Sequence, residues 1–125
     1  AGSARAIVCI TPDLAVAADI CDRVRVLYAG EMVELADIDP LFADPRHPYT
    51  RGLLSSMPHA SDLTPPLPTI RGSVPKPGSW PAGCRFSNRC DFHVVACDRP
   101  IPLTGETGRL VRCIRAEEFQ RETGQ

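Results

Sequence analysis

The sequence has no long apolar run and no signal-peptide pattern in its first residues. No stretch of its 125 residues approaches the roughly 18 consecutive apolar residues that would span a bilayer. The N-terminus also lacks the charged and then apolar pattern of a secretory signal. These two absences predict a cytosolic chain that does not insert into a membrane.

Signals of catalysis are equally scarce. There is no GxxxxGK(S/T) loop to bind the phosphates of a nucleotide. The histidines, His47, His59 and His93, have no serine or cysteine partner at catalytic spacing, and we interpret them as surface or packing residues. The formal net charge of -1, from 14 basic and 15 acidic residues, argues against a polyanion binder by average charge.

Cysteine, in contrast, is plentiful. Four of the six cysteines, Cys84, Cys90, Cys97 and Cys113, are separated by five, six and fifteen residues. The segment that holds them, residues 83–113, has few large apolar side chains, so burial alone cannot fix its shape. In a reducing cytosol such cysteines favour metal binding over a disulfide framework. The spacing therefore predicts a four-cysteine metal or cluster site.

The residues alone leave three states of these thiols open. Structural zinc sites usually contain cysteines roughly two to four residues apart, because the thiolates must converge on one small ion. An iron–sulfur cube binds one thiolate at each of its irons and accepts ligands from looser loops. The wide gaps therefore favour a cluster over zinc, and disulfides or unliganded thiols are the third alternative. The other two cysteines, Cys9 and Cys21, fall in apolar patterns and are predicted to be small buried side chains.

Arginines in the same segment suggest a different class of function. Residues 84–115 contain six arginines against three acidic residues, a local balance of +3, and this composition resembles zinc-ribbon nucleic-acid binders. However, Phe86 and Phe92 are the only aromatic residues between the outer cysteines, and no recognition helix is evident. A zinc-stabilised module that binds nucleic acid or a protein partner is therefore the alternative reading.

The first part of the chain shows an α/β pattern. Residues 4–10 form a β-branched run typical of a buried parallel strand. A helix is predicted next, with Thr11 as N-cap, Pro12 at the first helical position and an end near residue 23.

A hairpin and two helices are predicted to follow. Residues 24–37 alternate around Ala29-Gly30, which predicts a β-hairpin. A short helix is predicted at residues 40–43, and His47-Pro48-Tyr49-Thr50 begins another that runs to about residue 57.

Composition changes after this helix. Residues 58–81 contain seven prolines, which cannot donate the backbone hydrogen bonds of helices and sheets. This predicts an extended, semi-rigid connector. The predicted parts are thus an α/β unit, a helix with the proline-rich connector, a four-cysteine lobe and a polar tail, which occupy residues 4–44, 45–82, 83–115 and 116–125.

The order of these motifs resembles one protein family. Over about residues 5–115, the chain looks like the C-terminal part of the ATP-binding subunit of an oligopeptide or dipeptide ABC importer. The matching motifs are Ile10-Thr11 with Asp13-Leu14, Val26-Leu27-Tyr28-Ala29-Gly30, Leu41-Phe42, His47-Pro48-Tyr49-Thr50, Leu53-Leu54, and Gly83-Cys84 with Phe86 and Arg89-Cys90.

This resemblance implies both a fold and an activity. The fold would be an α/β fragment of an ABC ATPase domain followed by a proline-rich arm and a small, loop-rich four-cysteine lobe. The intact subunit would bind ATP and magnesium, drive peptide uptake, and assemble with a second ATP-binding subunit and membrane permeases at the cytoplasmic face of the membrane. Some members hold a 4Fe-4S cluster, which implies Cys84, Cys90, Cys97 and Cys113 as cluster ligands in a structural, redox or iron-sensing role, with zinc as the alternative.

Two features depart from the family pattern. Pro12 occupies the position of the switch histidine that senses the γ-phosphate of ATP, and proline has no imidazole to donate a hydrogen bond. An ATP site that depends on this position would be impaired, or would be the degenerate half of an asymmetric pair. The phosphate-binding loop, the magnesium-binding carboxylate and the signature loop are absent from the sequence. We therefore read the chain as a truncated C-terminal piece that does not hydrolyse ATP by itself.

Overall fold

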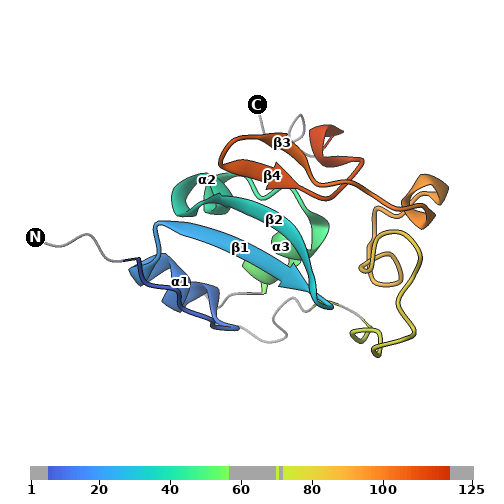
Figure 1. Cartoon of the computed structure of the whole chain (residues 1–125), viewed down its shortest axis with the longest axis horizontal. Helices are drawn as coiled ribbons and strands as arrows, with labels where there is room; N and C mark the ends of the chain where they lie inside the picture. Colours follow the sequence, from blue (N-terminus) through green and yellow to red (C-terminus); the bar gives the residue numbers. More distant parts are fainter. Residues whose placement is uncertain (1–5, 57–69, 71, 119–125) are drawn as a thin grey trace, which may run out of the picture.

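The computed structural model describes residues 6–56, 70 and 72–118. At its centre is a four-stranded antiparallel sheet with the strand order β1-β2-β4-β3 (Figure 1). β1 (Arg23–Tyr28) and β2 (Glu31–Asp37) come from the N-terminal part, whereas β3 (Thr104–Glu106) and β4 (Arg109–Val111) come from the cysteine-rich part. The sheet therefore joins segments that are far apart in the sequence, and the predicted α/β character is confirmed.

The predicted hairpin is confirmed in β1 and β2. Its turn residues, Ala29 and Gly30, have positive φ angles of +49° and +79°, which a type I′ turn requires at both central positions. The register shifts between Val26 and Leu27, which marks a β-bulge next to the turn. Bulges bend a strand and increase its local twist, so the end of the hairpin curves where the cysteine-rich segment meets it.

The described helices are short. α1 (Leu14–Ile20) precedes the hairpin, and α2 (Ile38–Ala43) and α3 (Pro48–Ser55) follow it. α2 packs against β1 and β2, and both α2 and α3 lie behind the sheet in the view of Figure 1. α3 begins at the predicted place, because Pro48 occupies the first turn, where a missing N–H breaks no helical hydrogen bond.

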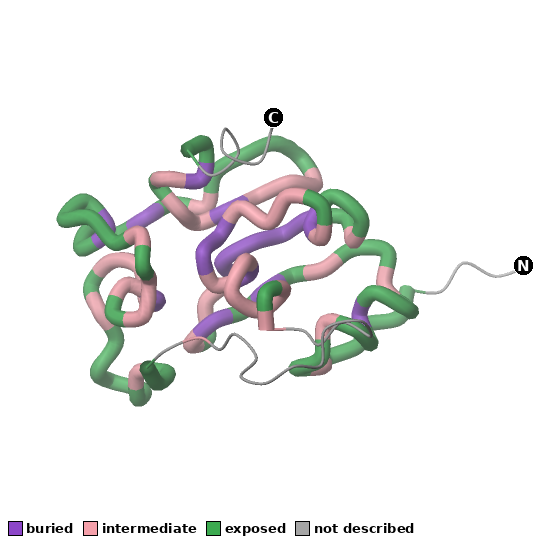
Figure 2. Tube along the Cα trace, turned by 180° about the vertical axis from the view of Figure 1, so that it is seen from behind, coloured by how far each residue is buried: buried purple, intermediate pink, exposed green. Residues whose placement is uncertain are grey.

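The core includes a side chain from the cysteine-rich segment. Phe86 is 3% exposed, and its ring meets the ring of Tyr28 edge-on with the centroids 5.2 Å apart. The ring of Tyr49 in α3 lies 5.4 Å from it. Buried positions run along the sheet and reach this segment (Figure 2). The core cluster consists of Val26, Tyr28, Val33, Ala36, Leu41 and Phe86.

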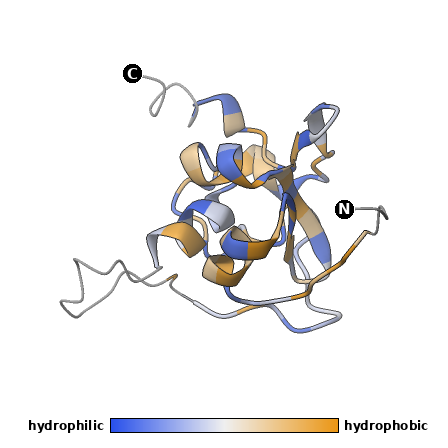
Figure 3. Cartoon of the chain, turned by 90° about the vertical axis from the view of Figure 1, so that its left-hand side faces the viewer, coloured by the Kyte–Doolittle hydropathy of each residue, from blue (hydrophilic) through white to orange (hydrophobic). Residues whose placement is uncertain are grey.

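The prediction of a buried strand at residues 4–10 is wrong for the part that the structure describes. Residues 6–10 contain no strand, and Ile7, Val8 and Ile10 are 88%, 87% and 94% exposed. They form an apolar stretch near the N-terminus (Figure 3). A parallel strand needs neighbours that pair with its backbone groups, and no described strand pairs with this stretch. Cys9, within this stretch, is exposed, contrary to the prediction, and Cys21, which caps the end of α1, is only half-buried.

The helix start after this stretch also differs from the prediction. Asp13 is the N-cap, and its carboxylate accepts the N–H of Ala15 at 2.9 Å. The hydroxyl of Thr11 instead accepts the N–H of Asp13, so Pro12 precedes the helix and does not occupy its first position. α1 ends at Ile20 and buries only one residue of its apolar stripe, Ala17.

Most of the predicted proline-rich connector lies outside the described residues, as do His59 and most of the polar tail. Ile70 packs against the core, and residues 72–81 contain turns and bends but no helix or strand. In the part of the chain that the structure describes, no helix has the length and apolarity needed to cross a membrane. The predicted domain boundaries stay predictions.

Candidate metal centre

One pocket brings the four predicted ligands together. Cys84, Cys90, Cys97 and Cys113 all line it. Cys97 is 9% exposed, and Cys84 and Cys90 also pack against the core. All four are free thiols, so the structure contradicts the disulfide alternative for these cysteines.

The pocket is closed by a close approach of two loop segments. The backbone N–H of Cys84 donates to the carbonyl oxygen of Cys97 at 2.9 Å. A Cβ atom at Gly83 would lie 2.0 Å from the same oxygen, so only glycine fits there. Cys97 belongs to a short 3-10 helix, Val95–Asp98, and Cys113 lies two residues after the end of β4. The thiols of the pocket therefore come from segments on either side of the β3–β4 hairpin.

A backbone amide donates to one of the four sulfurs, and two further amides lower the pKa of their cysteines, each from two residues further along the chain. The N–H of Phe92 donates to the sulfur of Cys90, with an N···S distance of 3.3 Å. Such N–H contacts favour a charged thiolate, and thiolates are the form that binds metals. The amides of Phe86 and Arg115 act in the same way on Cys84 and Cys113.

Three of the thiols, those of Cys84, Cys90 and Cys113, have raised pKa values and are uncharged at neutral pH in the absence of a cation. Burial raises the pKa of Cys84 to about 11 and that of Cys113 to about 12, and it also raises the pKa of Cys90. Neighbouring thiolates add to these shifts, because like charges repel one another. These three cysteines are therefore not low-pKa nucleophiles. A metal group that binds here has to replace their protons.

The four thiols line one pocket but do not form a ready-made metal site. Within residues 6–56, 70 and 72–118, no three His, Cys, Asp or Glu side chains form a group that could hold a metal ion as they stand. Tetrahedral zinc needs its ligand atoms at about 2.0–2.3 Å from one centre. An iron–sulfur cube is wider, and its thiolates lie around it.

Two histidines line the same pocket. His93 is near the surface, with its Nε2 atom 2.8 Å from Oδ1 of Asp98. His47 is 1% exposed, and its Nδ1 atom accepts the N–H of Tyr49 at 3.0 Å. Burial lowers the pKa of His47 to about 3, so its ring is neutral. The packing role predicted for His47 is confirmed, but sequence reasoning missed its place beside the cysteines.

Comparison with known protein families identifies the family to which this chain belongs. A family model described as "Oligopeptide/dipeptide transporter, C-terminal region" matches residues 33–97, just over half of the chain. The chain belongs to this family. The matched residues run from β2 through α3 to the 3-10 helix and include Cys84, Cys90 and Cys97, whereas Cys113 lies beyond them.

The curated relatives in this transporter family are longer than this chain. The protein named "Putative peptide import ATP-binding protein" of Brucella abortus is 45% identical over 108 residues, which cover 86% of this chain and 32% of the relative. The oligopeptide transport ATP-binding protein AppD of Bacillus subtilis is 46% identical over 114 residues, which cover 90% of this chain and 35% of the relative. The chain thus spans about a third of the length of the curated relatives it matches.

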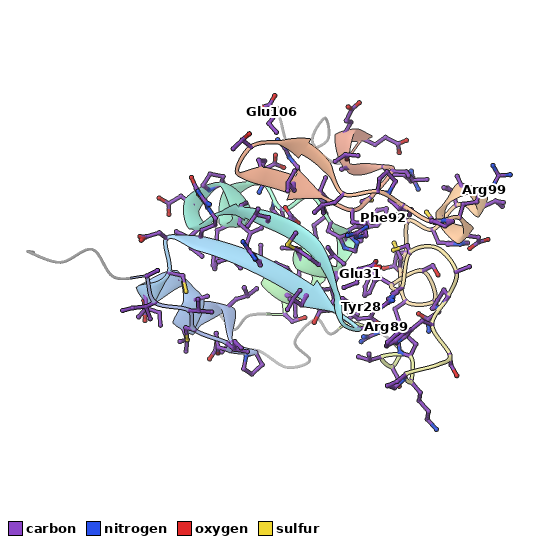
Figure 4. The ribbon with its side chains drawn as sticks, in the orientation of Figure 1. Tyr28, Glu31, Arg89, Phe92, Arg99 and Glu106 are labelled. Atoms are coloured by element: carbon purple, nitrogen blue, oxygen red, sulfur yellow. The ribbon has the colours of Figure 1, made fainter. Side chains whose placement is uncertain are left out.

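Most arginines of the cysteine-rich segment stabilise its loops by donating hydrogen bonds to backbone carbonyl groups. Arg112 donates from Nε to the carbonyl of Met32 at 3.0 Å and from Nη1 to that of Ile101 at 2.9 Å. Arg89 reaches the hydroxyl of Tyr28 at the end of the hairpin (Figure 4). Side chains engaged in this way are poorly placed to contact phosphates, which disfavours a nucleic-acid surface. The arginines that donate to backbone carbonyls are Arg85, Arg89, Arg109, Arg112 and Arg115.

Proposed function

We propose that this chain is the C-terminal part of the ATP-binding subunit of a peptide importer. The observation that carries the proposal is the family match over residues 33–97, together with relatives named for peptide import or oligopeptide transport that align with 85–90% of the chain. The intact subunit drives uptake of dipeptides or oligopeptides with ATP. It works with a second ATP-binding subunit and with permeases, at the cytoplasmic face of the membrane. These 125 residues contain no phosphate-binding loop, so we expect this part to supply no ATPase activity alone.

Within this subunit, the four-cysteine pocket binds a 4Fe-4S cluster. Cys84, Cys90, Cys97 and Cys113 are the ligands, one thiolate to each iron. Support comes from the pocket that all four line and from the N–H of Phe92 that donates to the sulfur of Cys90. When bound, the cluster supplies iron–thiolate bonds whose formation energy stabilises the fold.

The role of the site is structural. Cys113 lies two residues beyond β4, an inner strand of the sheet. Cys84 and Cys90 belong to the segment that packs on the core of the hairpin, and Cys97 to the 3-10 helix. A group held by all four thiols therefore fixes these loops to the sheet. A redox-sensing or iron-sensing role would depend on the same metal–thiolate bonds, because loss of the metal group would release the loops from the sheet.

Anaerobic metal analysis tests the cluster. The wild-type chain is purified without oxygen, and its iron, acid-labile sulfide and zinc are measured. We expect about four irons and four sulfides per chain. Cys84→Ser should lose most of this iron. Cys9→Ser should keep it, because Cys9 is exposed and outside the pocket.

Two results would overturn the cluster. One is a colourless wild-type protein with about one zinc per chain. The other is an iron content that is the same in Cys84→Ser as in Cys9→Ser. Peptide uptake by the intact importer with the Cys84→Ser subunit then tests the role: unchanged uptake would exclude both a structural and a sensing role in transport.

A further inference from the structure

Among the described residues that line the pocket, one buried nitrogen atom lacks a hydrogen-bond partner. His47 lines the pocket and is 1% exposed, and its Nε2 atom has no hydrogen-bond partner among the described residues. A buried donor left unsatisfied costs about 1–3 kcal/mol. Such groups are uncommon in native proteins, and each one calls for an explanation.

The start of α3 determines which ring nitrogen carries the proton. Nδ1 of His47 accepts the N–H of Tyr49 at 3.0 Å, so this nitrogen presents its lone pair. In a neutral imidazole the other nitrogen then carries the hydrogen, and Nε2 of His47 is a donor. Pro48 lies between the two residues and has a restricted φ angle, which helps to fix the ring.

The ring of His47 lies beside Phe86, the backbone at Arg112 and the sulfur-lined pocket. The edge of the ring faces Phe86, with the centroids 6.0 Å apart. The carbonyl of Arg112, next to Cys113, is close enough to raise the pKa of His47, but among the described residues no acceptor meets the geometry of a hydrogen bond with Nε2. Sulfur atoms of a cluster with negative charge are good acceptors, because hydrogen bonds to charged groups are stronger than those between neutral groups.

We propose that the Nε2–H of His47 donates a hydrogen bond to a sulfur of the group that the four cysteines hold. This inference rests on the proposed cluster and adds a positioning residue to it. The backbone N–H of His47 is itself held by the buried carboxylate of Glu34 at 2.9 Å. The hydrogen bond therefore connects the metal group to α3 and, through Glu34, to the centre of β2.

Two substitutions of His47 separate its role as the N-cap of α3 from its proposed role as a hydrogen-bond donor. His47→Asn keeps an acceptor for the N–H of Tyr49, because asparagine is a good N-cap, but it does not reach the position of Nε2. His47→Gln places an amide N–H closer to that position. His93→Gln is the control, since His93 lines the same pocket but its Nε2 already contacts Asp98.

The readouts are the iron and sulfide content and the midpoint potential of the cluster in the full chain. Hydrogen bonds to the sulfurs raise the potential of a cluster. We expect His47→Asn to load as the wild type does but to lower the reduction equilibrium constant about tenfold, which is about 59 mV for a one-electron couple. His47→Gln should recover part of this shift, and His93→Gln should not move it.

The outcomes separate this inference from the cluster itself. A loaded His47→Asn variant with the potential of the wild type would overturn the hydrogen bond and leave the cluster standing. A wild-type chain without iron would overturn both. If His47→Asn does not fold, pulsed EPR of the reduced cluster in 15N-histidine-labelled His93→Gln decides: a histidine 15N coupling supports the hydrogen bond, and its absence refutes it.

Discussion

Oε1 of Glu34 accepts the backbone N–H of His47 at 2.9 Å, although Glu34 lies in the middle of β2 and is 0% exposed. The N–H of Arg46 reaches both carboxylate oxygens at 3.2 and 3.0 Å. Nη1 of Arg109 in β4 lies 3.3 Å from Oε2. Burial raises the pKa of Glu34, and the two backbone N–H groups oppose that shift. One carboxylate thus holds the chain that enters α3 against two strands of the sheet.

The first prediction concerns this carboxylate. Glu34→Gln keeps the shape of the side chain, but its new NH₂ group faces the N–H of Arg46 and the guanidinium of Arg109. We expect the free energy of unfolding at neutral pH to fall by about 1–3 kcal/mol, measured by urea denaturation. Glu118→Gln is the matched control, because the side chain of Glu118 is 53% exposed and exposed ion pairs contribute at most about 1 kcal/mol. Equal losses in the two variants would contradict the bracing role of Glu34.

The second prediction is a loss of stability in acid. The pKa of His47 is about 3 in the folded chain against an ordinary value of 6.5, because burial disfavours the charged ring. The stability that His47 contributes is therefore complete above its unfolded pKa and is lost as the pH falls from about 6.5 toward 3. In the metal-free chain this loss approaches about 1.4 kcal/mol per pH unit.

Urea denaturation between about pH 7 and pH 5 measures this slope. His47→Asn has no ring to titrate, so its free energy of unfolding should fall less steeply over the same range. Parallel profiles for the two chains would show that His47 is not the group responsible.

The third prediction tests whether the cysteine-rich segment is part of the core. Phe86→Ala removes a ring that packs on Tyr28 and Tyr49, and we expect a loss of about 3–5 kcal/mol in the free energy of unfolding. Val95→Ala, in the same segment but 82% exposed, should change it by less than about 0.5 kcal/mol. If the hairpin kept its full stability in Phe86→Ala, the segment would be an independent lobe.

The sequence predicted local features better than long-range ones. The hairpin could be predicted because Ala29-Gly30 separates two alternating runs. The start of α3 could be predicted because Pro48 suits the first turn of a helix. β3 and β4 were missed because each has only three residues, too few for an alternating pattern. Their pairing with β2 depends on contacts between distant segments, which local patterns do not encode.

The same distinction applies to the candidate site. Cysteine spacing predicted that Cys84, Cys90, Cys97 and Cys113 form one site. All four line the same pocket, and their role as ligands stays a prediction. The place of His47 beside them could not be predicted, because it depends on how α3 packs behind the sheet. Likewise, the arginines suggested a charged surface by composition, whereas most of them donate to backbone carbonyls once the loops have folded.

The last prediction concerns Gly83, where the pocket closes. An added Cβ would lie 2.0 Å from the carbonyl oxygen of Cys97 and 2.6 Å from that of Arg99. Both are backbone atoms that cannot rotate away, so Gly83→Ala must separate Cys84 from Cys97. We expect a loss of at least about 2 kcal/mol in the free energy of unfolding and an iron and sulfide content well below that of the wild type.

Gly78→Ala is the control for this substitution. Gly78 has a φ angle of +90° and no atom within 4 Å of the added Cβ, so the cost is limited to the backbone conformation, about 1–2 kcal/mol. Metal loading should be unchanged, since Gly78 does not line the pocket. A Gly83→Ala chain that loads as much iron as Gly78→Ala would mean that the approach of Cys84 to Cys97 is not needed to form the site.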